Sequence, residues 1–239
     1  MTVAISTFGS IISPLFDMSQ RVDLYRLEGG RASMKRQLPV GDLSVREKIQ
    51  LLVSSKVHVL ICGAISRYSQ QSLLLEGIQV YPWTSGNSEE VLALLAARYG
   101  KPDGRVGQEG GPVFPVAIPA MGPDMNGVVA SNPRSCRCLF LLCGEDMSWD
   151  IHELPAREWS SDSVQTVQAM VGAGARALFT PRCSPALLAL LAVAGIEVIL
   201  GASGTVRQVA EQYCRGDAPR AGNRTQDGVE RKIIHENNL

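Results

Sequence analysis

The residues best suited to bind a ligand form a short loop, residues 62–67, directly after an apolar run. Such a run predicts a strand buried on both faces, and open α/β sheets bind ligands beyond the carboxyl ends of their strands. Gly63 lets the backbone approach a ligand closely, and Ser66 and Arg67 are donors suited to an anion. A tight turn in which Ser66 caps a helix and Cys62 is a small core residue explains the same loop equally well.

Three cysteines are candidate ligands for a soft metal: Cys62, Cys136 and Cys183. Cys136 and Cys138 would lie about 6 to 7 Å apart on one face of a strand, and Cys183 belongs to the second-half loop that matches residues 62–67. Cys143 lies roughly 16 Å from Cys138 along the strand and is predicted to be a core residue. A Cys-x-Cys pair is also typical of buried thiols that bind nothing.

Nothing in the sequence predicts catalysis. His58 falls inside an apolar run and is predicted to be a satisfied core residue, and His152 and His235 lie in polar segments, so no Ser-His-Asp or Cys-His arrangement is indicated. A two-metal nuclease needs converging carboxylates, whereas the predicted strand ends carry Ser6, Cys62, Pro119 and Thr180. We therefore expect a binding protein and not an enzyme.

Composition narrows the class of partner. Lys plus Arg and Asp plus Glu are both 23, the net charge is zero and the pI is about 6.8, so there is no field to attract nucleic acid. The most apolar stretch, 186–196, is shorter than the roughly 20 residues that cross a bilayer. With no charged segment typical of a secretory signal, we expect a cytoplasmic protein with reduced thiols.

An internal repeat organises the chain. Residues 57–95 align without a gap with residues 175–213, at a shift of 118. In each half a helix with a capping box comes first, followed by a buried strand, a second helix that stops at a glycine, a second strand and a last capped helix. The boxes are Ser44 with Glu47, Asp162 with Gln165, Asn87 with Glu90, and Thr205 with Gln208; the glycines are Gly77 and Gly195.

The segments ahead of these units read as the start of an antiparallel meander. The predicted strands are 3–7 and 24–27 in the first half, and 116–119 and 138–143 in the second. The resulting fold class is α/β, with two tandem domains that each contain a mixed sheet of about five strands and flanking helices.

The domain boundaries follow from composition. A Gly-rich and charged linker at 105–112 separates a first domain, 1–104, from a second, divergent domain, 113–216. A polar tail at 217–239 is expected to be disordered.

Four segments together resemble the dinitrogenase iron-molybdenum cofactor biosynthesis family, which includes nitrogenase cofactor carriers and the orange protein. They are ISPLFDMSQRVDLYRLEGG, LICGAISR, GIQVYPWTSGNSEEVLALL and GIEVILGASGTVRQVAEQY. The resemblance implies a ribonuclease-H-like fold in each half and non-catalytic carriage of an iron-molybdenum or related metal-sulfur cluster. The partners that it implies are cluster-assembly proteins or a ParA/MinD-type ATPase. The implied cofactor-binding residues are Ser13, Phe16, Cys62, Gly63, Ile65, Ser66 and Arg67.

The second half departs from this pattern. Where the first half has the loop 63–66, the second reads Pro181-Arg182-Cys183-Ser184, and the Ser-Pro-x-Phe turn has become 131–134. We therefore expect the main site in the first half and a weaker or vestigial site, built from Cys183 and Cys136, in the second. The alternative is a metal-free scaffold or regulatory protein that works through its surfaces.

Overall fold

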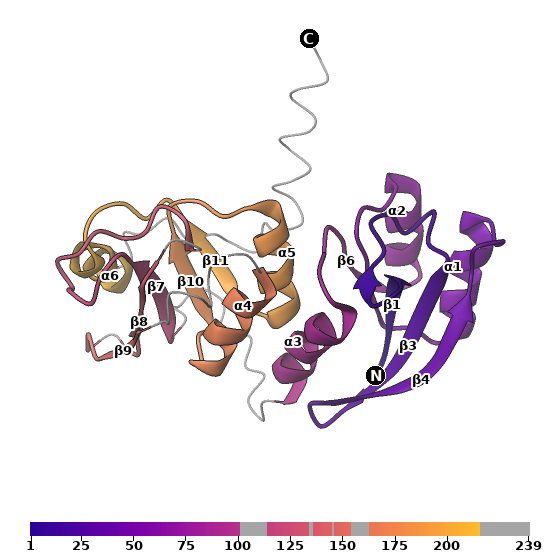
Figure 1. Cartoon of the computed structure of the whole chain (residues 1–239), viewed down its shortest axis with the longest axis horizontal. Coiled ribbons are helices and arrows are strands. Elements are labelled where there is room, and N and C mark those ends of the chain that lie inside the picture. Colours follow the sequence, from indigo (N-terminus) through magenta and orange to yellow (C-terminus); the bar gives the residue numbers. More distant parts are fainter. Residues whose placement is uncertain (101–113, 134–135, 145, 154–162, 216–239) are drawn as a thin grey trace, which may run out of the picture.

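The structure is a computed structural model that describes residues 1–100, 114–133, 136–144, 146–153 and 163–215. These residues form two α/β units, one from each half of the chain, which lie side by side (Figure 1). The predicted linker 105–112 and tail 217–239 lie outside the described residues. The domain boundaries therefore stay predictions.

The first half forms a mixed sheet in the order β4-β3-β1-β5-β6, with the short β2 paired to β1. β3 is antiparallel to both β1 and β4, whereas β5 is parallel to β1 and β6. The strands are β1 (Thr2–Phe8), β2 (Ile11–Ile12), β3 (Arg21–Glu28), β4 (Arg31–Pro39), β5 (Val59–Ile61) and β6 (Gln79–Tyr81), and the helices are α1 (Val45–Ser54), α2 (Arg67–Leu75) and α3 (Ser88–Gly100).

The second half repeats this topology. Its sheet has the order β9-β8-β7-β10-β11, again with an antiparallel meander followed by parallel strands. The strands are β7 (Val116–Ala120), β8 (Cys138–Leu142), β9 (Trp149–Glu153), β10 (Ala177–Thr180) and β11 (Glu197–Leu200), and the helices are α4 (Ser163–Gly172), α5 (Pro185–Ala194) and α6 (Val206–Arg215). The predicted tandem arrangement of two mixed sheets is confirmed; the ribonuclease-H-like assignment stays a prediction.

The helix boundaries follow the predicted caps. Ser44 and Glu47 form a reciprocal capping box at the start of α1. Gly195 ends α5 in the left-handed conformation, at φ 73°, and Gly77 follows α2 at φ 76°. The helices α4, α5 and α6 begin 118 residues after α1, α2 and α3, whereas the predicted cap of α4, Asp162, lies outside the described residues.

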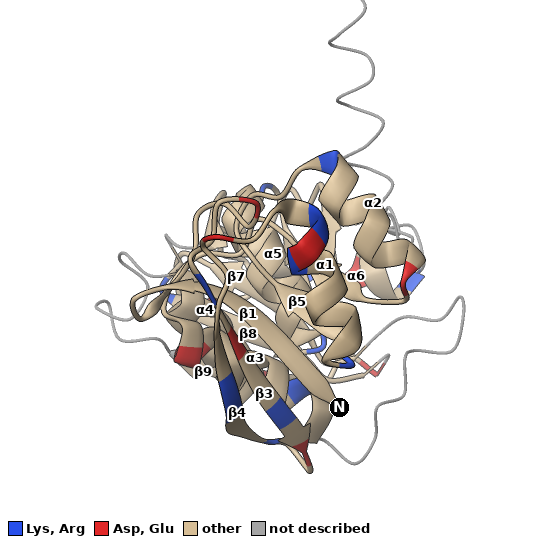
Figure 2. Ribbon diagram, turned by 90° about the vertical axis from the view of Figure 1, so that its right-hand side faces the viewer, with Lys and Arg blue, Asp and Glu red and all other residues tan. Residues whose placement is uncertain are grey.

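The strands β4 and β9, which the sequence did not predict, extend each meander. β4 is an edge strand whose residues are all exposed except Leu38. Figure 2 shows basic residues along β3 and β4, and charged side chains on an edge strand discourage pairing with other chains.

One helix belongs to the cores of both halves. α3 covers one face of the first sheet and packs against α4 and α5 of the second half (Figure 1). The Arg98 guanidinium extends this contact, because it donates to the Tyr81 hydroxyl at 2.6 Å and to the Ala192 carbonyl oxygen, near the end of α5, at 3.0 Å. The two halves therefore share a hydrophobic cluster.

In the part of the chain that the structure describes, no helix is long and apolar enough to cross a bilayer.

Candidate functional site

The first-half loop is closed by backbone hydrogen bonds to the segment that follows β2. Gly63 N donates to the Ser13 carbonyl oxygen at 3.2 Å, and Ala64 N donates to that of Pro14 at 2.8 Å. Phe16 N returns a bond to the Ala64 carbonyl oxygen at 2.8 Å. The predicted ligand-binding residues Ser13 and Phe16 thus lie beside Gly63. The space between this loop and the segment 13–16 is occupied by the chain itself.

Gly63 is required by this close approach. A Cβ atom at Gly63 would lie 2.4 Å from the Pro14 carbonyl oxygen and 2.5 Å from that of Ser13. Gly63→Ala is therefore expected to destabilise the fold by about 1–3 kcal/mol, as overpacking does. Urea denaturation measures this, with Gly122→Ala as a control because a Cβ atom there meets nothing within 4 Å. Equal stability of the two variants would show that the loops can separate freely.

Cys62 and Ile65 are buried. They pack in the cluster between the first sheet and helices α1 and α2, together with Phe16. Burial holds the pKa of the Cys62 thiol well above its ordinary value, so the thiolate that a metal needs is disfavoured. The structure supports the core interpretation of Cys62.

The start of α2 is occupied by a carboxylate of the same chain. Ser66 caps the helix, and its N–H and hydroxyl donate to the Asp17 carboxylate at 2.8 and 3.1 Å. The Ser69 hydroxyl also donates to Asp17. Because the partial positive charge of a helix N-terminus favours an anion, Asp17 takes the place that the sequence suggested for a ligand.

A buried lysine holds the Asp17 segment in place. Lys48 Nζ donates to the carbonyl oxygens of Asp17 and Ser19 at 2.8 and 2.9 Å. The residue is buried, and this burial lowers the pKa of its amine. Sequence reasoning missed both Asp17 and Lys48, since these contacts join residues about 30 to 50 positions apart.

In the second half, the segment that corresponds to residues 13–16 begins with the same kind of backbone hydrogen bond. Ala130 N donates to the Pro119 carbonyl oxygen as Ser13 N donates to that of Ser6, both at 2.8 Å. Ala130 and not Ser131 therefore takes the place of Ser13, one residue earlier than the predicted turn. At this register the counterpart of Asp17 is Arg134, which lies outside the described residues.

Proline prevents the second-half loop from closing as the first does. Pro181 aligns with Gly63 at the shift of 118. It has no N–H to donate and carries a ring where the first half has no room for a Cβ atom. The two loops cannot make the first-half pattern of hydrogen bonds, and a pocket of about 390 Å³ lies between them.

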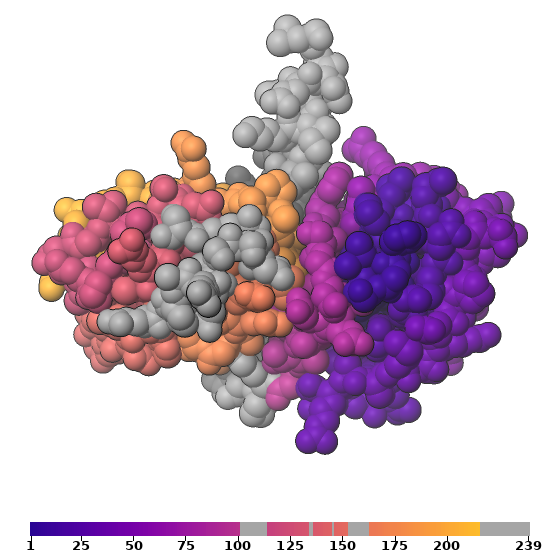
Figure 3. All heavy atoms as spheres, viewed as in Figure 1, coloured from indigo at the N-terminus to yellow at the C-terminus, as the bar shows by residue number. Residues whose placement is uncertain are grey.

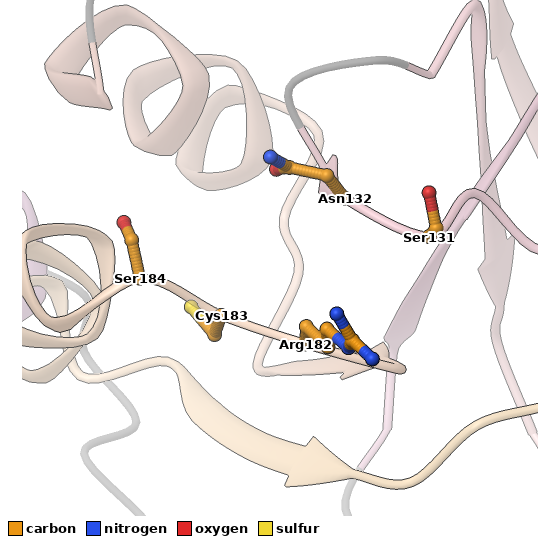
Figure 4. Close-up of a pocket in the computed structure, with 5 residues that line it drawn as sticks. All are labelled: Ser131, Asn132, Arg182, Cys183 and Ser184. Atoms are coloured by element: carbon orange, nitrogen blue, oxygen red, sulfur yellow. The ribbon is translucent and has the colours of Figure 1, made fainter.

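This pocket lies beyond the carboxyl end of β10, at the start of α5 (Figure 4). Ser184 is the N-cap of α5, and its hydroxyl accepts a hydrogen bond from Leu187 N at 3.3 Å. Arg182 is exposed and Cys183 is partly exposed. The residues that line the pocket are Ser131, Asn132, Arg182, Cys183 and Ser184.

The lining suits an anion that contains sulfur or a soft metal. Arg182 supplies a permanent positive charge, and the serine hydroxyls and the Asn132 amide can donate hydrogen bonds. Cys183 is a soft ligand. The N-terminus of α5 adds a favourable field for negative charge.

Within the described residues the predicted cysteine ligands form no closed metal site, although Cys183 packs against the cluster that contains Cys136. Cys136 packs in the cluster beside α4 and α5, whereas Cys138 packs in the cluster beside α6. The predicted common face of these two thiols is therefore wrong, because β8 begins only at Cys138 and the alternation of a strand does not extend to Cys136. Burial raises the pKa of Cys136 to about 12.

Two further sequence predictions are corrected. Cys143 is exposed and not a core residue, since it follows the last residue of β8. His58 is also exposed, because it precedes β5, and its Nδ1 accepts a hydrogen bond from Thr2 N at 3.2 Å. Within the described residues, no three His, Cys, Asp or Glu side chains are grouped to hold a metal ion.

Comparison with known proteins identifies the first half. Residues 1–98 match the model of a family described as dinitrogenase iron-molybdenum cofactor. The match covers residues 1–98, and for these residues the resemblance seen in the sequence is confirmed.

Two solved structures are similar to parts of the chain. The apo orange protein from Desulfovibrio gigas is 23% identical, with 47% of this chain and 97% of that chain covered and a TM-score of 0.42. A Thermotoga protein of the DUF35 family is 21% identical, with 46% and 100% covered and a TM-score of 0.39. No curated protein matches the chain.

Proposed function

We propose that the protein is a non-catalytic carrier of a molybdenum-iron or related metal-sulfur cluster, with the cargo bound in the pocket of the second half. The observation that carries the proposal is the pocket lining, in which a guanidinium, a thiol and neutral donors line one pocket at the start of a helix. The family of the first half, whose name refers to the iron-molybdenum cofactor, supports the class of cargo. Proteins that assemble such clusters are the expected partners.

The two halves would then have different roles. In the first, a carboxylate of the chain occupies the helix start, so an anionic cluster would meet a negative charge and a closed loop. In the second, the loop is open and a pocket lies at the helix start. The cargo-binding roles that the sequence suggested for residues 62–67 pass, in this proposal, to Arg182, Cys183 and Ser184, of which Cys183 aligns with Ile65 and Ser184 with Ser66.

Each lining residue has a defined task. Arg182 compensates the negative charge of the cargo, and Cys183 offers one thiolate to a metal at the surface of the cargo. Ser184 keeps the start of α5 directed at the pocket, since its hydroxyl caps the helix. With a single thiol, binding is weaker than in a closed four-cysteine site, as delivery to a partner requires.

Anaerobic incubation with tetrathiomolybdate and ferrous iron, followed by desalting and elemental analysis, tests the proposal. Arg182→Gln and Cys183→Ser are each expected to lower the retained molybdenum about tenfold, a loss of about 1.4 kcal/mol of binding free energy. Cys143→Ser and Arg207→Gln are matched controls, because they remove an exposed thiol and an exposed guanidinium elsewhere. Equal retention by all four variants would refute binding in this pocket.

The closed first-half loop favours one alternative, a metal-free protein that works through its surfaces. Under that alternative the wild-type protein retains no molybdenum at all. The same measurement therefore separates the two functions.

A further inference from the structure

Two sulfur-containing side chains from distant parts of the second half meet at one point. The Cys214 thiol donates to Met147 Sδ, and the two sulfur atoms are 3.7 Å apart. Cys214 lies in the last turn of α6, and Met147 lies in the turn that joins β8 to β9. Both residues are partly exposed and pack against the hydrophobic cluster beside α6. An ion in solution can therefore reach them.

The topology of the second half brings these two residues together. The last residue of β8, Leu142, pairs with the first residue of β7, Val116. The turn after β8 therefore lies at the amino ends of the parallel strands. α6 follows β11 and packs back along the sheet to the same edge, which is opposite to the pocket beyond β10. Figure 3 shows the yellow residues of α6 at the outer end of the second half, away from the indigo first half.

The first half has small residues at the corresponding place. There the turn between β3 and β4 meets the end of α3, and a Cβ atom at Gly30 would lie 2.5 Å from Gly100 Cα and 3.4 Å from the Ala96 carbonyl oxygen. Ala96 aligns with Cys214 at the shift of 118. The meeting of this turn with this helix end is thus common to both repeats, whereas the pair of sulfur atoms is a feature of the second.

The chemistry of the pair suits a soft metal ion. A thiolate and a thioether are the soft ligands that select Cu(I) among the first-row metals. Two metal–sulfur bonds of about 2.3 Å that enclose an angle of about 110° span the observed 3.7 Å between the sulfur atoms. One ion can therefore bind both atoms in place of the hydrogen bond, without movement of the backbone.

The charge of the pair favours a monovalent ion. Binding releases the Cys214 proton to water, so the thiolate supplies one negative charge and the Met147 thioether supplies none. The C-terminal end of α6 adds a partial negative charge, which favours a cation. A structural zinc ion takes four ligands, whereas the described part of the chain groups no three His, Cys, Asp or Glu side chains around a common point.

We propose that Cys214 and Met147 bind one soft monovalent metal ion, with Cu(I) as the biological ion, at the edge of the second sheet opposite to the cargo pocket. This site shares no residue with that pocket. The proposal therefore goes beyond the carrier function and does not depend on it.

Transfer of Cu(I) from its coloured complex with bicinchoninate, under anaerobic and reducing conditions, tests the proposal. The reference is the full chain with Cys183→Ser, because this substitution removes the thiol of the cargo pocket. The reference should withdraw one Cu(I) per chain. Addition of Cys214→Ser or of Met147→Leu should each raise the dissociation constant for Cu(I) about tenfold or more. Leucine keeps the volume of methionine, so the Met147 variant removes the sulfur atom and preserves the packing.

Cys143→Ser and Met125→Leu are the matched controls in the same background. Cys143 is an exposed thiol that follows β8, and Met125 is partly exposed and packs against the same cluster as Met147. Neither substitution should change the dissociation constant for Cu(I). Equal withdrawal of Cu(I) by the reference and by its Cys214 variant, or equal effects of Met147→Leu and Met125→Leu, would overturn the proposal.

Discussion

Replacing Leu95 with alanine is expected to destabilise both halves of the protein together, by about 3 kcal/mol. Leu95 is completely buried on α3, in the cluster that contains residues of both sheets and of helices α4 and α5. A cavity at this position removes packing from both units at once. Urea unfolding should therefore show one transition, shifted to lower denaturant, whether it is followed by circular dichroism or by hydrogen exchange in either half.

Leu75→Ala is the control for this experiment, since it truncates a leucine of the neighbouring helix α2 that is exposed. It should change the stability by less than about 0.5 kcal/mol. Two separate transitions in the Leu95 variant, with the second half unaffected, would show that the shared cluster does not couple the halves.

Replacing Pro181 with glycine is expected to close the pocket and lower cargo uptake about tenfold or more. Glycine restores the N–H and removes the ring, so the loop can make the two bonds that Gly63 and Ala64 make in the first half. Two backbone hydrogen bonds of about 1 kcal/mol each favour the closed form, and apparent affinity falls with the fraction of open pocket.

The uptake assay described above measures this effect. Pro39→Gly is the control, because Pro39 is an exposed proline at the end of β4 in the other half. Unchanged retention of molybdenum in the Pro181 variant would mean that the proline does not keep the pocket open.

The repeat and its helices could be predicted because their signals are local. Capping residues lie within three positions of the groups they bind, and two of them recur 118 residues apart, Ser66 as Ser184 and Asn87 as Thr205. The meander was predicted only in part. Apolar and polar residues alternate little in β4, and the strand is exposed along most of its length. Its sequence pattern therefore does not distinguish a strand from a loop.

The sequence of α3 contains a signal for its packing against both halves that the sequence analysis did not use. Its sequence, SEEVLALLAARYG, is apolar on more than one side, which is typical of a helix covered on two faces. α6, at the same place in the second half, has a polar outer face instead. A comparison of these two helices would have predicted that the halves pack through α3.

The site proposed for the cargo lies at the place in the fold that the sequence indicated, but in the other half of the chain. The sequence favoured the first-half loop, whereas the pocket at the matching loop lies in the second half. The reason is the contact between Asp17 and Ser66, which are 49 residues apart, and no local pattern reports such a contact. The sequence shows that Pro181 stands at the position of Gly63. The effect of this proline could be recognised only from the loop that Gly63 contacts in the first half.

The number of clusters bound per chain tests the central claim most directly. Anaerobic equilibrium dialysis of the wild-type protein against tetrathiomolybdate and ferrous iron should saturate at one cluster per chain, because one of the two repeated loops is open and the other holds Asp17. Saturation at two per chain would show that the first-half loop also opens. No binding at all would contradict the carrier function.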